Sequence, residues 1–204
     1  MPLREEKLSE ILLTSYSEGY FQKPEFQLSS FDDEIKSVYS KLGGIMDSYP
    51  TSFRGFDICC KDFIVELDEE QHFNRYRLAT LDSSIYTGFR GFNINSYKKF
   101  CVNFESECLS KADNRKYWSS DSTTSQFGDS SSPGILTESG SSRWKQRAFY
   151  DYLRDVGSVM GAYKLVRISI WDKVGGVLVK DILDKKMQNM YGGLKQLIEE
   201  CTTV

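Results

Sequence analysis

The stretch Phe56–His72, FDICCKDFIVELDEEQH, alternates apolar and polar residues on both sides of a polar turn at Lys61-Asp62. Successive side chains of a strand point to opposite faces of a sheet, so this pattern predicts two short strands that form a hairpin. A two-residue loop pairs Cys60 with Phe63, Cys59 with Ile64, Ile58 with Val65 and Asp57 with Glu66. One face of the hairpin is then apolar, and the other carries Asp57, Glu66 and Asp68.

The three carboxylates on one face of this hairpin have an electrostatic cost. Directly opposed residues have Cβ atoms about 5 Å apart, and like charges placed there repel each other. A divalent cation turns that repulsion into coordination, because hard cations prefer carboxylate oxygens. The pattern therefore predicts that Asp57, Glu66 and Asp68 bind a divalent cation. The alternative is a face that is polar because it is exposed to water.

The composition predicts one globular domain of 204 residues, with 40% hydrophobic and 14% aromatic residues. The net charge of −3 gives no general attraction to nucleic acid, so any such site must be a local basic patch. No apolar run approaches the roughly 20 residues of a membrane span, and the charged N-terminus lacks the apolar core of a signal peptide. We therefore expect a cytoplasmic protein that has no membrane partner and whose five cysteines are reduced. The spacing of Cys101 and Cys108 does not fit a zinc framework, and His72 is the one histidine.

Apolar residues at three- and four-residue spacing predict a series of helices. The predicted ranges are 3–16, 30–42, 73–80, 96–111, 142–157 and 183–200, the last with a break near Gly192-Gly193. Tyr163–Ile170 is rich in β-branched and aromatic residues and predicts a strand. Residues 45–53 fit either a short edge strand or a loop, and Pro50 favours an edge.

The helix at 142–157 has the clearest amphipathic pattern. Ser141 or Ser142 is its expected N-cap, and Gly157 is its expected end. Its predicted buried side comprises Trp144, Ala148, Phe149, Tyr152, Leu153 and Val156. Its predicted outer side carries Lys145, Arg147, Asp151 and Arg154.

Residues 118–142 are dominated by Ser, Thr, Gly and Asp. A compact domain seldom contains so long a structureless loop unless the loop is mobile or functional. We therefore expect a flexible Ser/Gly-rich segment at 118–142 within an insertion that spans about 74–142.

The hairpin, the basic helix and the following strand together resemble the PD-(D/E)XK nuclease superfamily, and most closely its very-short-patch-repair-like branch of small endonucleases. The matching pieces are Asp57, the run Ile64–Asp68, Gln71-His72, the helix that carries Arg147 and Arg154, and Leu165–Ile168. The resemblance covers about half of the chain. It implies an α/β fold with a restriction-endonuclease-like core, in which helices flank a central mixed sheet, and a single nuclease-like domain over 1–204.

The resemblance also implies roles for individual residues. Asp57 and Glu66 would bind Mg²⁺ or Mn²⁺, and the ion would activate a water and stabilise the phosphoryl charge. Asp68 departs from the superfamily, whose usual residue there is Lys; as an acid it would add a metal ligand. Gln71 would donate a hydrogen bond to the attacking water, and Glu34 resembles an extra acid that some members contribute.

The remaining expected site residues are basic or titratable. The candidates for contact with nucleic acid are Lys61, Arg75, Lys145, Arg147 and Arg154. The alternative for these residues is a solvated helix or turn surface. His72 is a candidate base or ligand, or else it hydrogen-bonds a backbone group.

Three functional hypotheses follow. The first is a metal-dependent endonuclease that hydrolyses phosphodiester bonds in nucleic acid, with DNA favoured. The second is a catalytically impaired nuclease-fold module that binds nucleic acid or a protein partner. The third, ranked last, is a glycosidase-like use of two carboxylates about 5–9 Å apart. The sequence leaves the oligomeric state open, and a homodimer is one option.

Overall fold

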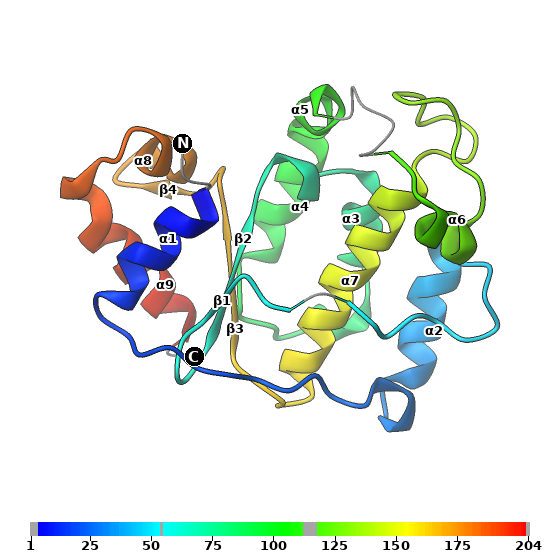
Figure 1. Ribbon diagram of the computed structural model, residues 1–204, viewed down its shortest axis with the longest axis horizontal. Helices are drawn as coiled ribbons and strands as arrows, with labels where there is room; N and C mark the ends of the chain where they lie inside the picture. The colour runs from blue at the N-terminus through cyan, green and yellow to red at the C-terminus, as the bar shows by residue number, and fades with distance from the viewer. Residues whose placement is uncertain (1–3, 54, 112–117, 203–204) are drawn as a thin grey trace.

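The computed structural model describes residues 4–53, 55–111 and 118–202, and these form a mixed α/β fold (Figure 1). A three-stranded sheet has the order β1-β2-β3, with β1 at Ile58–Cys59, β2 at Ile64–Asp68 and β3 at Leu165–Ser169. The central strand β2 is antiparallel to β1 and parallel to β3. Two short strands, β4 (Lys173–Val174) and β5 (Val177–Leu178), form a separate ribbon. The expected class, a small mixed sheet flanked by helices, is confirmed.

The hairpin has the register that the alternation predicts. Ile58 pairs with Val65, and Cys59 pairs with Ile64. The backbone N–H of Cys60 donates to the carbonyl of Phe63 at 2.9 Å, which closes the turn. The two-residue period of strand side chains is rigid, so a short turn between two patterned strands fixes every pair.

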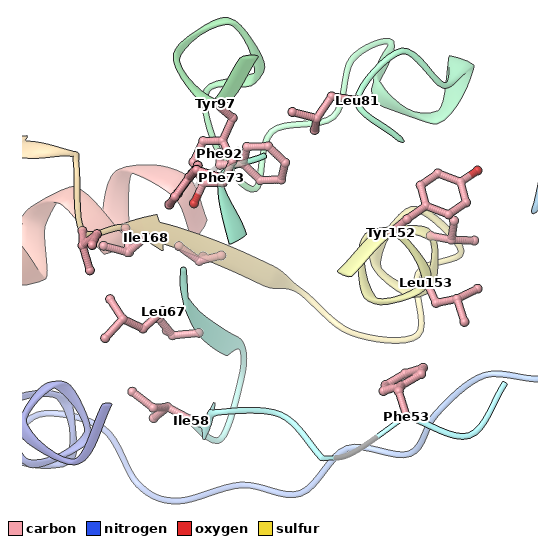
Figure 2. Packing of buried hydrophobic residues seen from close by; sticks show 14 of the residues in the cluster. Phe53, Ile58, Leu67, Phe73, Leu81, Phe92, Tyr97, Tyr152, Leu153 and Ile168 are labelled. Carbon is pink, nitrogen blue, oxygen red and sulfur yellow. The ribbon is translucent and has the colours of Figure 1, made fainter. Parts of the chain in front are cut away.

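The apolar face of the sheet is covered by three helices. These are α1 (Arg4–Leu13), α8 (Val179–Asp184) and α9 (Tyr191–Thr202). Figure 2 shows Ile58, Leu67 and Ile168, one from each strand, within the same packed cluster. Leu8 and Leu194 complete this layer, and both are fully buried.

The polar face of the sheet is covered by α7 (Ser142–Val159), which runs diagonally through the middle of the view in Figure 1. Further helices surround it: α2 (Asp32–Lys41), α3 (Arg75–Thr80), α4 (Ile94–Asn103), α5 (Glu105–Ser110) and α6 (Asp121–Phe127). Ser141 caps α7 by accepting a hydrogen bond from the N–H of Trp144. All six residues of the predicted apolar side of α7 are buried.

Several sequence-based predictions of secondary structure are wrong in detail. The single helix expected at 96–111 is two helices, α4 and α5, which meet at Phe104. The final helix is interrupted between α8 and α9, and Gly192-Gly193 lie inside α9. For residues 45–53, where the sequence allowed an edge strand or a loop, the structure has a loop.

The segment 118–142, expected to be a structureless loop, contains α6. A capping box at Ser120 and Thr123 starts this helix. Trp118 is buried against Trp144, with ring centroids 5.2 Å apart. Phe127 packs on the ring of Tyr39 at 5.2 Å. The composition of the segment resembles a loop, but hydroxyl caps and these two aromatic contacts are enough to fold it.

No helix in the described ranges combines the length and the apolar character that crossing a membrane requires.

Gly157 does not end α7, which continues to Val159. The glycine instead allows the ring of Tyr163 to approach the helix. A Cβ at this position would overlap Tyr163 Oη and would lie 2.6 Å from Cζ. Tyr163 Oη donates to the carbonyl of Arg154 at 3.0 Å, so the ring cannot move away without losing this bond.

We expect Gly157→Ala to destabilise the protein by about 1–3 kcal/mol, the usual cost of an overpacked contact. For a chain of this size the change corresponds to a fall in Tm of about 2–4 °C per kcal/mol in thermal unfolding. Gly192→Ala is the matched control, because that helical glycine has open space around its Cβ position. Equal Tm values for the two variants would contradict the role given to Gly157.

Candidate functional site

A pocket of about 570 Å³ lies between the hairpin and α7. Its lining comprises Ser52, Asp57, Glu66, His72, Ser122, Gln126, Arg143, Gln146, Arg147, Tyr150, Asp151 and Arg154. The strands contribute carboxylates, and α7 contributes most of the basic and amide groups. This division follows from the fold, because the polar face of the hairpin and the polar stripe of α7 face each other.

The hairpin supplies Asp57 and Glu66 to this pocket. The backbone N–H of Asp57 donates to Glu66 Oε1 at 3.2 Å, and the N–H of Leu67 donates to Asp57 Oδ2 at 3.0 Å. Glu66 is 2% exposed, and its burial raises its pKa to about 8. Arg154 opposes this rise, whereas the neighbouring Asp57 adds to it. Burial also raises the pKa of Asp57.

Asp68, the third predicted acid, pairs with a different residue, Arg167. Its Oδ1 accepts from Arg167 Nη1 at 2.8 Å, and its buried Oδ2 accepts no hydrogen bond from the described residues. Within the described part of the chain, one set of three possible ligand atoms lies within 4.8 Å of one another. It comes from Asp68, His72 and Asp151, so the acids Asp57, Glu66 and Asp68 do not form such a set.

His72 lies between the two other members of that set. Its Nδ1 is 2.8 Å from Asp151 Oδ2 and 3.2 Å from Asp68 Oδ1. A proton on Nδ1 therefore accounts for the closeness of the three side chains without a cation. Burial acts to raise the pKa of Asp151, but the charges of His72 and Arg167 outweigh it and hold this pKa well below its ordinary value.

Arg167, on β3, contacts Asp68 and also two residues of α7. Its Nε contacts Asp155 Oδ1 at 2.7 Å, and its Nη2 donates to the backbone carbonyl of Asp151 at 3.0 Å. Asp155 in turn contacts Arg77 Nη2 at 2.7 Å and accepts from Tyr86 Oη at 2.7 Å. Every charged member of this network is buried, so each depends on its partners.

The polar stripe of α7 carries the basic groups of the pocket. Each of its pocket-lining residues has another one three or four positions away, so they share a helix face. Arg154 is 9% exposed and lies 3.3 Å from Glu66 Oε2 through Nε, an ion pair outside hydrogen-bond geometry. Arg143 Nε is also buried without an acceptor among the described residues.

Arg147 has no hydrogen bond or ion pair with any residue that the structure describes. Its burial lowers its pKa, which means that its positive charge is poorly compensated. A half-buried guanidinium in a pocket, with its donors unused, is suited to an anion. The pocket thus combines a carboxylate floor with arginine donors.

The other residues predicted from the sequence lie outside this pocket. Lys61 is exposed in the hairpin turn, and Arg75 pairs with Glu105 at 2.7 Å. Lys145 lies over the ring of Tyr76. Glu34 accepts from the hydroxyls of Ser83 and Ser84, and Gln71 is in the turn after β2.

Sequence reasoning missed four of the pocket residues that matter here. Asp151 was assigned to the outer side of α7, and Arg143 was not singled out. The i, i+4, i+8 spacing of Arg143, Arg147 and Asp151 is a usable signal for one shared face. Gln126 comes from the segment read as a loop, and Tyr150 carried no distinguishing signal.

A second cavity, of about 740 Å³, lies near the start of β3. Its lining includes Lys164, Leu165 and Arg90, with Asp62 as its one acid. Its lining contains no group of facing carboxylates, so the pocket between the hairpin and α7 is the better candidate for a catalytic site.

We expect Arg167→Met to lower the free energy of unfolding by about 3–5 kcal/mol, because it leaves buried carboxylates without their cation. Urea unfolding measures this change. Arg75→Met is the matched control, since it removes an exposed ion pair worth less than about 1 kcal/mol. A small effect at Arg167, similar to that at Arg75, would contradict the network described above.

We also expect Glu66 to make stability depend on pH when no metal is added. Its folded pKa of about 8 exceeds the ordinary 4.5, so between these values the folded protein holds a proton that the unfolded chain has released. The free energy of unfolding therefore falls as pH rises through this window, by up to about 1.4 kcal/mol per pH unit, and levels off above it.

Urea unfolding in EDTA at about pH 5 and about pH 9 tests this expectation. Glu66→Gln should lose most of the pH dependence and should be more stable than the wild type at the higher pH. Glu25→Gln, at an exposed position, should retain the wild-type dependence. Identical pH dependence in wild type and Glu66→Gln would show that Glu66 ionises normally.

Residues 37–185 match the family described as "Family of unknown function (DUF7255)". The match covers β1, β2, α7 and β3 and includes every residue that lines the pocket. The comparisons with curated proteins and with solved structures found no match. Because the match spans most of the chain, the chain belongs to the DUF7255 family of unknown function.

Proposed function

We propose that this protein is a metal-dependent nuclease that hydrolyses phosphodiester bonds, with DNA as the favoured substrate. The observation that carries the proposal is one pocket in which Asp57 and Glu66 face arginines with unused donors. Carboxylates suit a hard cation, and guanidinium groups suit a phosphate. A neutral sugar would leave the arginines without a role, which disfavours the glycosidase hypothesis.

The residues at the pocket floor fit a divalent cation. Asp57 and Glu66 are the groups that would hold it, and the buried Glu66 carboxylate is costly to ionise without one. Their oxygens suit either Mg²⁺ or Mn²⁺. When bound, the cation would polarise the phosphoryl group and activate a water.

The chain's own residues supply binding and proton transfer. Arg143 and Arg147 would bind the phosphate from the α7 side. His72, held through Nδ1 by Asp151, has Nε2 as its second ring nitrogen, which would accept a proton in the pocket. Asp151 is then a positioning residue, because it fixes the orientation of the imidazole.

The restriction-endonuclease-like arrangement is part of this proposal. Three features support it: the acidic hairpin, the mixed order β1-β2-β3, and the α7 helix that precedes β3. Asp68 stands where the superfamily usually has Lys, and its pairing with Arg167 gives it a structural partner instead. The positive charge that the Lys would provide comes from α7 in this proposal.

We expect the wild type to cleave oligonucleotides with Mg²⁺ or Mn²⁺ and to stop in EDTA. Asp57→Asn and Glu66→Gln should each lower kcat/KM by about 100-fold or more, because they remove groups that act on the developing charge. Gel analysis of labelled DNA and RNA substrates measures the rates, and thermal unfolding verifies that the variants fold.

Asp62→Asn is the matched control, since Asp62 is exposed in the hairpin turn away from the pocket, and its rate should equal that of wild type. Cleavage that survives EDTA, or that Glu66→Gln leaves intact, would contradict the nuclease. If no substrate is cut but nucleic acid binds with a steep salt dependence, the inactive binding module is the correct hypothesis.

A further inference from the structure

We infer that the nucleic acid enters this pocket unpaired, as a single-stranded segment of DNA or RNA. This inference rests on the proposed function and specifies its substrate class. It follows from the depth of the carboxylate floor, from the walls around it and from the arginines inside it.

The floor of the pocket is deep at Glu66. This side chain is 2% exposed and lines the pocket, whereas the neighbouring Asp57 is half-buried. A volume of about 570 Å³ is typical of small-molecule sites, and it admits a nucleotide but not a turn of double helix. An unpaired strand has a flexible backbone, so it can bring one phosphodiester into a pocket of this size.

Helix α6 forms the wall opposite the hairpin, and the structure holds it firmly. It lies beside the first part of α7, next to α2 (Figure 1). Thr123 Oγ1 is 2.9 Å from Ser142 Oγ, and the carbonyl of Gln126 accepts from the N–H of Ile45 at 3.0 Å and from Tyr39 Oη at 2.6 Å. Because these contacts hold the wall in place, we expect it to hinder a rigid duplex more than a flexible single strand.

The wall and the adjoining part of α7 present neutral hydrogen-bonding groups to the pocket. Gln146 Nε2 donates to Gln126 Oε1 at 2.9 Å, and Gln126 Nε2 donates to Tyr150 Oη at 3.2 Å. Amide groups hydrogen-bond to the edges of bases, and tyrosine rings stack on the faces of bases. In a duplex these edges are paired and the faces are stacked, so this cluster suits an unpaired base.

Arginines with unused donors lie inside the pocket. Arg143 Nε and Arg154 Nε are buried without an acceptor among the described residues, and both residues line the pocket. A flexible single strand can bring its phosphates to basic groups inside such a groove.

The test compares four labelled substrates of equal length with wild-type protein and Mg²⁺ or Mn²⁺: single-stranded DNA, single-stranded RNA, blunt duplex DNA, and the same duplex with a central unpaired bubble. We expect the better of the two single strands to be cut at least about 10-fold faster than the duplex, since pairing energy must be overcome in the duplex. Cuts in the bubble substrate should fall within the bubble. A duplex cut as fast as the single strands would overturn the inference and leave the nuclease intact.

Two variants test whether the preference for single strands depends on the wall. Gln126→Ala should lower the single-strand rate several-fold and leave the slow duplex rate unchanged, whereas Gln22→Ala, at an exposed site, should change neither. Equal losses on single strand and duplex would contradict the wall's role.

Fluorescence anisotropy with Glu66→Gln separates the two proposals. If no substrate is cut, the nuclease proposal is wrong. The ratio of the single-strand Kd to the duplex Kd still decides whether the inference about unpaired substrate holds. Tighter binding of the duplex would overturn it.

Discussion

The interaction on which the rest of this structure depends is the buried guanidinium of Arg167. It contacts a carboxylate on the neighbouring strand, a carboxylate on α7 and a backbone carbonyl of α7. Removing these charges from water costs several kcal/mol per ion, and only well-formed partners repay it. The strand pair and α7 therefore have one relative position in which all the charges are compensated. Through Asp155 the same constraint extends to Arg77, and so to the helices between β2 and α7.

This arrangement separates two kinds of carboxylate on one face of the sheet. Asp68 is compensated by Arg167 and serves the fold. Glu66, two residues away, accepts a hydrogen bond from the backbone N–H of Asp57 and forms an imperfect ion pair with Arg154, and its charged form stays unfavourable. The pocket lies over the less compensated acid. A polar face of this kind would be a defect in a protein that needed stability alone, and its retention is consistent with a role in binding.

The sequence predicted the hairpin to the residue because strand alternation has an exact period of two and the turn is short. It also predicted the buried side of α7 and the strand after it. It failed on the other side of α7, because a helix stripe that faces water and one that faces a polar pocket have the same pattern. The predicted outer side of α7 therefore includes Asp151 as well as the candidate nucleic-acid contact Arg154, and both are buried. Helix α6 escaped prediction because its Ser/Thr caps resemble loop composition, and the ion pairs of Arg167 depend on a parallel pairing that no local pattern encodes.

The parallel pairing of β2 with β3 has a consequence for how the chain folds. β2 ends at Asp68 and β3 begins at Leu165, so nearly half of the chain must be ordered before the two strands can pair. Contacts so distant in sequence form slowly, because the entropy of closing the loop is lost before the contacts are gained. The hairpin could form early from local contacts, but it opposes Asp57 to Glu66 before any arginine has arrived. The hairpin is thus a weak nucleus, and the native sheet and the pocket are expected to appear in the same late step.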